Sequence, residues 1–247
     1  MANPALAVLE SALRAKKLDR TLTTALPPLP RTDAASLAPF DTTILDTCLR
    51  GGLPRGHLSE IAGPCSSGRT TLVLQAAAAA TRRGEIAAIV DTFDRLDVAS
   101  VVSAGATLER VLWIRGDACS TAQPALVDRA VERALKAVNL VLQAGGFGLV
   151  ALDFADVPPS ALKRIPFTTW LRIQRAVEGR DTACVLLVPQ PMARSAGGLT
   201  LTLGGAVAWA GNSDRSRRLE ALNVDARVVS PRRTVEGTVR VRCSAGV

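Results

Sequence analysis

The stretch that decides the fold is Gly63-Pro64-Cys65-Ser66-Ser67-Gly68-Arg69-Thr70-Thr71. A short β-prone run, residues 58–62, precedes it, and residues 72–80, which close with a run of alanines, follow it. Alanine is the strongest helix former, so the order is strand, glycine loop and helix. Glycines let backbone N–H groups turn inward around phosphate oxygens, and the helix N-terminus behind them favours an anion. The pattern therefore predicts a phosphate-binding loop, with the Thr70 hydroxyl as a ligand for Mg²⁺.

One position departs from the usual phosphate loop, because Arg69 stands where a lysine is expected. Lysine is a compact charge on a flexible stem, whereas arginine is a planar fork. Arg69 keeps the positive charge but cannot follow the β- and γ-phosphates with the same geometry. The loop leaves two states open, a site that holds ATP and Mg²⁺ and an empty one, and it predicts weak hydrolysis or none.

The composition favours a polyanionic partner. The 247 residues carry a formal net charge of +8 and have a pI near 10.1, mostly because of arginine. Such a charge favours nucleic acid as a partner, although arginine-rich chains also exist without one. Aromatic residues make up only 3% and tyrosine is absent, so the core must be built from alanine, leucine and valine.

The cysteine pattern indicates free thiols. The 5 cysteines are widely spaced, no C-x-x-C pair occurs, and His57 is the only histidine. This usage predicts a reducing compartment and no zinc site. No signal peptide precedes the chain, and no apolar run is long enough to span a bilayer. We therefore expect a cytoplasmic protein with no membrane contact.

The chain divides into two predicted parts, residues 1–40 and a core domain over residues 41–247. The first part holds an expected helix and a proline-rich linker over residues 27–39. A detached apolar stripe on that helix must be buried either on the chain's own core or on a neighbouring protein, and the sequence leaves both open. The stripe, a candidate partner-binding surface, consists of Leu6, Leu9 and Leu13.

The core domain alternates apolar runs with amphipathic ones. Near-continuous apolar runs predict buried parallel strands, and a 3.6-residue period predicts helices. The strands are expected at 86–91, 111–115, 147–153 and 184–188, the helices at 42–49, 96–103 and 123–143, and edge strands at 206–210, 219–229 and 238–241. In the long helix, the residues expected to face the sheet are Leu126, Ala130, Val131, Leu135, Val138 and Leu142.

Two polar residues follow the ends of predicted strands. Asp153 closes the strand over 147–153, and Gln190 lies just past the strand over 184–188. A carboxylate beside a phosphate site can hold Mg²⁺ through water, so Thr70 and Asp153 are candidate metal ligands. The alternative is that Asp153 caps the next turn. The candidate nucleotide site comprises Gly63, Pro64, Cys65, Ser66, Ser67, Gly68, Arg69, Thr70, Thr71, Asp153 and Gln190.

Basic side chains gather in the loops after Asp153 and Gln190 and in the C-terminal strands. Arginines on edge strands are often simply solvated, and we expect this for half of those near the C-terminus. The scarcity of aromatic residues argues against recognition by base stacking. The candidate contacts to DNA, with single strands favoured, are Lys163, Arg164, Arg194, Arg217, Arg218, Arg232 and Arg233.

Several segments resemble the core of the bacterial RecA recombinases. They are Leu45-Asp46, Gly52-Leu53-Pro54-Arg55-Gly56, Glu60-Ile61-Ala62-Gly63-Pro64 and Ser66-Ser67-Gly68-Arg69-Thr70-Thr71-Leu72, followed in order by Asp153 and Gln190. The resemblance implies the RecA-like α/β fold, which has a mostly parallel central sheet with helices on both faces. Nucleotide binds at the carboxyl ends of the strands in such a fold. It also leads us to expect antiparallel edge strands at the C-terminus.

The departures from that family bear on catalysis. Recombinases carry a glutamate soon after the second strand that polarises the attacking water, and the aligned position here is Phe93. Asp94 is one residue too far along, since one step at a strand end redirects the side chain. The loops that hold single-stranded DNA in RecA are also altered, at residues 155–166 and 191–200, and we expect no counterpart of the large C-terminal domain of RecA. With Arg69, Phe93 predicts a silent or crippled ATPase.

A short, degenerate RecA-like chain with an N-terminal helix and a proline linker resembles the ImuA family. The resemblance implies a non-catalytic accessory role in SOS-induced mutagenic translesion DNA synthesis. The partners that it implies are DNA, an ImuB-like inactive Y-family protein, RecA and an error-prone C-family polymerase. The alternative is a DNA-dependent ATPase of RecA type that uses Arg69 as its cation. A small-molecule phosphotransferase is a weaker third reading, because no candidate base lies near the loop.

Overall fold

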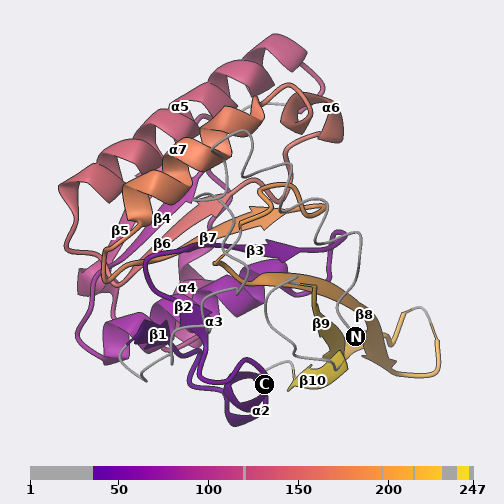
Figure 1. The fold of residues 1–247 in the computed structure, drawn as a ribbon. Helices are drawn as coiled ribbons and strands as arrows, with labels where there is room; N and C mark the ends of the chain where they lie inside the picture. Colours follow the sequence, from indigo (N-terminus) through magenta and orange to yellow (C-terminus); the bar gives the residue numbers. More distant parts are fainter. Residues whose placement is uncertain (1–35, 119–120, 196, 214, 230–237, 245–247) are drawn as a thin grey trace, which may run out of the picture. The chain divides into compact units, whose positions relative to one another are not determined.

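The computed structural model describes residues 36–118, 121–195, 197–213, 215–229 and 238–244 (Figure 1). Within these ranges the main sheet has eight strands in the order β10-β9-β8-β3-β7-β6-β4-β5. Helices cover both faces of this sheet. The expected α/β architecture is confirmed, with a mostly parallel centre and antiparallel strands near the C-terminus.

Five neighbouring strands of the sheet are parallel to one another, and their bounds are β3 (Leu58–Ala62), β7 (Ala183–Val188), β6 (Leu149–Asp153), β4 (Ala87–Asp91) and the edge strand β5 (Val111–Arg115). Nearly every residue of β3, β4, β6 and β7 is buried. Strands covered on both faces are rich in apolar side chains, which explains the continuous apolar runs of β4, β6 and β7. Because these strands are parallel, their carboxyl ends lie at one edge of the sheet.

Alternate residues of these strands supply two separate cores. Ile61 and Ile89 pack with α3 (Arg69–Arg82) and α4 (Val98–Ser103) on one face. Ala62 and Val90 pack on the other face with α5 (Pro124–Ala144) and α7 (Phe167–Val177), which lie side by side in Figure 1. The short helix α6 (Pro159–Leu162) joins this second core. The alanines of α3 let that helix lie close to the sheet.

The long helix α5 confirms the expected amphipathic pattern with one shift in phase. Its first turn buries Val127 instead of Leu126, which is 41% exposed. Pro124 occupies the first turn of the helix, and Gly145 ends it with φ +69°. The amino end of the helix is therefore rotated slightly from the orientation that we predicted. Further along, Ala130, Val131, Val138 and Leu142 are buried as expected.

The C-terminal strands begin earlier than expected. β8 (Thr200–Ala210) starts parallel to β3 with Thr200 beside Glu60, and then pairs antiparallel with β9 (Arg218–Val228). β10 (Thr238–Ser244) pairs antiparallel with β9. The expected start at residue 206 was wrong because the alternation of buried Leu201 and Leu203 extends the strand toward its amino end. β8 is thus an internal strand, and only β9 and β10 continue the sheet antiparallel.

A small two-stranded sheet precedes the core. β1 (Leu37–Ala38) pairs antiparallel with β2 (Leu53–Pro54), and α2 (Thr43–Cys48) connects them. A Cβ on Gly52 would lie 2.2 Å from the Ala38 carbonyl oxygen, so this pairing requires glycine. The end of the expected linker therefore forms a strand. The boundary that we placed at residue 40 stays a prediction, and Leu6, Leu9 and Leu13 lie outside the described residues.

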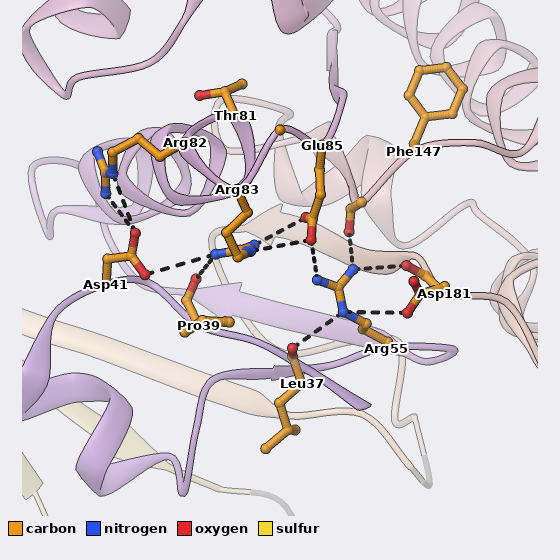
Figure 2. A network of polar contacts seen from close by, with 12 residues as sticks. Leu37, Pro39, Asp41, Arg55, Thr81, Arg82, Arg83, Glu85, Phe147 and Asp181 are labelled. Atoms are coloured by element: carbon orange, nitrogen blue, oxygen red, sulfur yellow. Dashed lines mark hydrogen bonds and ion pairs between the residues drawn. The ribbon is translucent and has the colours of Figure 1, made fainter. Parts of the chain in front are cut away.

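Arg55 ties the amino edge of the sheet together (Figure 2). Its guanidinium pairs with Glu85, Nη2 to Oε1 at 2.6 Å, just before β4. It also donates to the carbonyl oxygens of Asp181, at 2.8 Å, and Leu37, at 3.2 Å, before β7 and in β1. These partners come from segments far apart in the sequence. Arg55 thus fastens the small sheet to the amino ends of the parallel strands.

Candidate nucleotide-binding site

The glycine loop joins β3 to α3, as the sequence predicts. Gly63 donates its N–H to the carbonyl oxygen of Val188 at 3.2 Å, which anchors the loop to the end of β7. A Cβ on Gly63 would lie 2.5 Å from the Leu203 carbonyl oxygen, so the close approach of β8 requires glycine there. Gly68 has φ +88° and immediately precedes α3. Pro64, Cys65 and Ser66 are exposed between them, so the loop presents an open backbone at the helix N-terminus.

Ser67 supplies a polar group that the described protein atoms do not satisfy. Its side chain is buried, and its hydroxyl oxygen is the one buried side-chain polar atom without a hydrogen-bond partner in the described part of the chain. A buried hydroxyl left alone costs free energy, so it marks a place where a ligand atom can be accommodated. The loop therefore fits a phosphate group, because a phosphate oxygen could form the hydrogen bond that the Ser67 hydroxyl lacks.

Arg69 lies inside the site and not in solvent. Its side chain is 5% exposed, and Nη1 donates to the carbonyl oxygen of Ala155 at 3.2 Å. That carbonyl belongs to the segment after β6, two residues past Asp153. The guanidinium thus spans from the phosphate loop to the adjacent strand end. A lysine could not make this contact with the same fork-like geometry.

Asp153 ends β6 beside Asp91, the last residue of β4. Burial raises the pKa of Asp153 to about 6. The hydrogen bond from the Ala155 N–H, at 2.8 Å, and the positive charge of Arg69 act against this rise, while Asp91 and Asp156 add to it. A cation bound beside this carboxyl would stabilise its ionised form. A bound Mg²⁺ would be held by Thr70, which is exposed in the first turn of α3, and by Asp153.

The described residues contain no group of three or more histidine, cysteine, aspartate or glutamate side chains that could hold a metal ion by itself. Gln190 is exposed two residues past β7, the neighbour of β3. The structure therefore brings the loop, Asp153 and Gln190 to the same edge of the sheet.

In the segment after β4, Phe93 lies in the core and Asp94 is ion-paired. Phe93 is 5% exposed and belongs to the apolar core shared with α5. Both carboxylate oxygens of Asp94 accept from Arg115, each at 2.7 Å, and this interaction lowers the pKa of Asp94. Arg95 pairs with Asp156 at 2.6 Å. The segment thus uses its charges for internal ion pairs.

The candidate DNA contacts fall into separate groups. Lys163 and Arg194 line one hollow together. Arg164 forms an ion pair with Asp128, so its charge is partly compensated. Arg217 and Arg218 are exposed at the start of β9, away from that hollow. Arg232 and Arg233 lie outside the described residues.

Sequence reasoning missed Glu60, which is 1% exposed in the middle of β3. Its Oε1 accepts from the backbone N–H groups of Met192 and Ala193, at 2.8 and 2.7 Å. Gln174 on α7 donates to the Ala193 carbonyl oxygen at 3.2 Å. The loop after Gln190 is therefore fastened to the sheet. A glutamate within a predicted buried strand was the available signal.

A comparison with protein families matches residues 31–161 to the RecA N-terminal domain. Protein RecA of Borrelia hermsii is 39% identical over 112 residues, which cover 45% of this chain and 28% of that protein. Protein RecA of Prochlorococcus marinus (strain MIT 9211) is 42% identical over 109 residues, 44% of this chain and 26% of that protein. The matches thus span less than a third of these relatives. No helix in the described ranges has the length and apolar character to cross a membrane.

Proposed function

The chain belongs to the RecA N-terminal domain family, and from this premise we propose that it is a non-catalytic accessory protein of the ImuA type. In this proposal it acts in the cytoplasm, in SOS-induced mutagenic translesion synthesis and DNA damage tolerance. It binds DNA and protein partners there, namely an ImuB-like inactive Y-family protein, RecA and an error-prone C-family polymerase. The RecA relatives support the family and leave this finer role to experiment.

The observation that carries the proposal is the structure of residues 92–95. Phosphoryl transfer to water depends on a group that orients the nucleophile. Phe93 is turned into the core, and Asp94 is held by Arg115 through two hydrogen bonds. The Thr92 hydroxyl donates to the Asp153 carbonyl oxygen at 2.6 Å, so it too is engaged. Because these side chains are already engaged, the contacts of residues 92–95 support the proposal that the protein does not hydrolyse ATP.

We further propose that the loop still binds ATP with Mg²⁺. The unsatisfied Ser67 hydroxyl, the buried cation of Arg69 and the helix N-terminus all favour phosphate. When bound, Mg²⁺ neutralises phosphate charge, and Thr70 and Asp153 are the residues that hold it. When Arg69 turns toward a phosphate, it exchanges its hydrogen bond to the Ala155 carbonyl oxygen for one to a phosphate oxygen.

Three measurements test this function. Steady-state ATPase assays with and without single-stranded DNA should give no turnover above background, while a fluorescent ATP analogue should bind and lose affinity in Arg69→Ala. Pull-downs should retain the ImuB-like protein and RecA. Robust DNA-stimulated turnover would contradict the non-catalytic role, and failure to retain either partner would contradict the accessory role.

The alternative, a DNA-dependent ATPase of RecA type, is favoured by one observation, the intact strand–loop–helix with an arginine inside it. In that case Arg69→Lys should preserve or raise turnover. Substitution Arg69→Ala should abolish it. If the wild type shows no turnover under any condition, this alternative fails.

DNA contact is a separate proposal. Lys163 and Arg194 are exposed, and Arg217 and Arg218 add charge at the start of β9. Each phosphate contact to a single strand contributes a log–log salt slope of roughly −0.7. We expect Lys163→Ala and Arg194→Ala each to reduce the slope by about that amount. A flat salt response in the wild type would contradict DNA binding.

A further inference from the structure

An apolar hollow lies between α6, α7 and the loop after β7. It has a volume of about 350 Å³. Trp170, which is 2% exposed, and Leu162 contribute to its lining from the helices, and Met192 contributes from the loop. Phe167, which is 49% exposed, also belongs to this lining. A cavity of this size accommodates one or two amino-acid side chains.

The loop side of the hollow is held in place by the protein itself. Glu60 accepts from the N–H groups of Met192 and Ala193, and Gln174 donates to the Ala193 carbonyl oxygen. Ala193 is fully buried as a result. A preformed site loses little conformational entropy when it binds, which favours affinity from a small contact.

The charges that line the hollow have one sign. Lys163 and Arg194 are the charged residues of its lining, and no carboxylate is among the described residues that line it. Neither cation forms an ion pair with another described residue, whereas the adjacent Arg164 pairs with Asp128. The hollow therefore joins an apolar lining with positive charge that no described residue compensates.

We propose that this hollow binds a short acidic peptide segment of a partner protein, with an apolar side chain of the peptide inside it. Carboxylates of the peptide pair with Lys163 and Arg194 on the same surface. Met192 adapts its unbranched side chain to the inserted group, as methionine does at surfaces that accept varied partners. The proposal goes beyond the proposed function, because it does not depend on nucleotide turnover. Lys163 and Arg194 are also proposed DNA contacts, so peptide and DNA share these two cations, and the apolar contact with Met192 distinguishes the peptide.

A peptide fits the hollow better than a nucleic acid does. Binding to single strands relies on aromatic faces for base stacking. Trp170 is buried and packs edge-on against Phe154, with ring centroids 6.4 Å apart, so it presents no face to a base. Phe167 is then the one exposed ring among the described residues of the lining, and a single ring stacks on no more than a base or two. Two cations also neutralise only a short stretch of phosphates. An apolar side chain flanked by carboxylates uses both properties of the site.

The test uses the full chain and a short fluorescein-labelled peptide that carries a leucine–phenylalanine pair between aspartates. We expect saturable binding by fluorescence polarisation. Met192→Ala should weaken it about tenfold, since it removes buried apolar surface. Lys163→Glu with Arg194→Glu should weaken it about tenfold or more at low salt, and less at high salt. Arg172→Glu, an exposed cation of α7 outside the hollow, is the matched control and should leave affinity unchanged.

Unfolding curves of each variant show whether a loss of binding reflects a loss of fold. A peptide with serines in place of the leucine–phenylalanine pair should not bind, and equal binding of that peptide would overturn the proposal. No saturable binding of the first peptide would overturn it as well. Displacement of the peptide by a single-stranded oligonucleotide whose own affinity falls in Met192→Ala would assign the hollow to nucleic acid instead. If the wild type binds the peptide but shows no DNA binding, the result contradicts only the proposed DNA contact and leaves the peptide site standing.

Discussion

Two arginines with largely buried side chains lie at opposite ends of the parallel strands, and they differ in how their charge is compensated. Arg55, at the amino edge, pairs with Glu85 and donates to the carbonyl oxygens of Leu37 and Asp181 (Figure 2). Arg69, at the carboxyl edge, makes one side-chain hydrogen bond to the described residues, to Ala155. Near it lie a buried hydroxyl without a partner and a carboxyl whose pKa burial raises.

The difference shows how burial alone fails to separate structure from function. A buried charge must be paired or hydrogen-bonded to be tolerated. At the amino edge the protein supplies the partners itself, so the arginine stabilises the fold. At the carboxyl edge the partners are incomplete, so the arginine can take a ligand. The substitutions below sharpen this contrast, from the largest expected effect on stability to the smallest.

Arg55→Ala should destabilise the protein by about 3 kcal/mol, because it leaves Glu85 without its closest partner and releases three backbone carbonyls. Urea unfolding measures the free energy. Arg82→Ala removes an exposed pair with Asp41 and is the matched control, with an expected loss below about 1 kcal/mol. Equal losses in the two variants would remove the structural role that we assign to Arg55.

Asp153→Asn should stabilise the protein at pH 8. Burial raises the pKa of Asp153 from 3.8 to about 6, so the folded state favours the protonated form. Below the pKa that Asp153 has in the unfolded chain, its carboxyl is protonated in both states and the stability is fully present. The free energy of unfolding then falls as the pH rises through 6, because the buried carboxylate ionises. We expect a gain of about 2 kcal/mol at pH 8 and little difference below pH 4.

Urea unfolding at the two pH values makes this measurement. Asp94→Asn is a control of opposite sign, because Arg115 lowers the pKa of Asp94. The stability from Asp94 is present above its unfolded pKa and is lost as the pH falls. A gain in Asp153→Asn that did not change with pH would contradict the assigned ionisation.

Arg69→Met should cost about 1 kcal/mol of stability or less, since it removes one hydrogen bond from a poorly compensated charge. The same substitution should abolish binding of a fluorescent ATP analogue. Arg69 thus separates stability from ligand binding, which Arg55 does not. A stability loss as large as that of Arg55→Ala would make Arg69 a structural residue.

Much of the fold could be predicted from the sequence because its signals are local. The apolar runs of β4, β6 and β7 and the alanines of α3 need no distant information. The start of β8 was missed because Thr200 pairs with Glu60, a partner far away in the sequence. Leu126 was misplaced because a first helical turn has few neighbours to fix its phase.

The candidate site was predictable in its parts and not in its connections. The glycine loop and Asp153 follow from residue identity and spacing, whereas the hypothesis that Phe93 replaces a catalytic carboxylate comes from the resemblance to the recombinases and stays a prediction. The bond from Arg69 to Ala155 and the pairing of Asp94 with Arg115 depend on which strands become neighbours. The same holds for the clamp that Glu60 makes on the loop after Gln190.

The central claim is that the scaffold binds without turnover, and one measurement tests it most directly. ATP hydrolysis should be followed with saturating single-stranded DNA for the wild type and for Phe93→Glu combined with Arg69→Lys. The account predicts that the wild type hydrolyses ATP only at the background rate and still binds the fluorescent ATP analogue. DNA-stimulated hydrolysis by the wild type, well above that of Arg69→Ala, would contradict it.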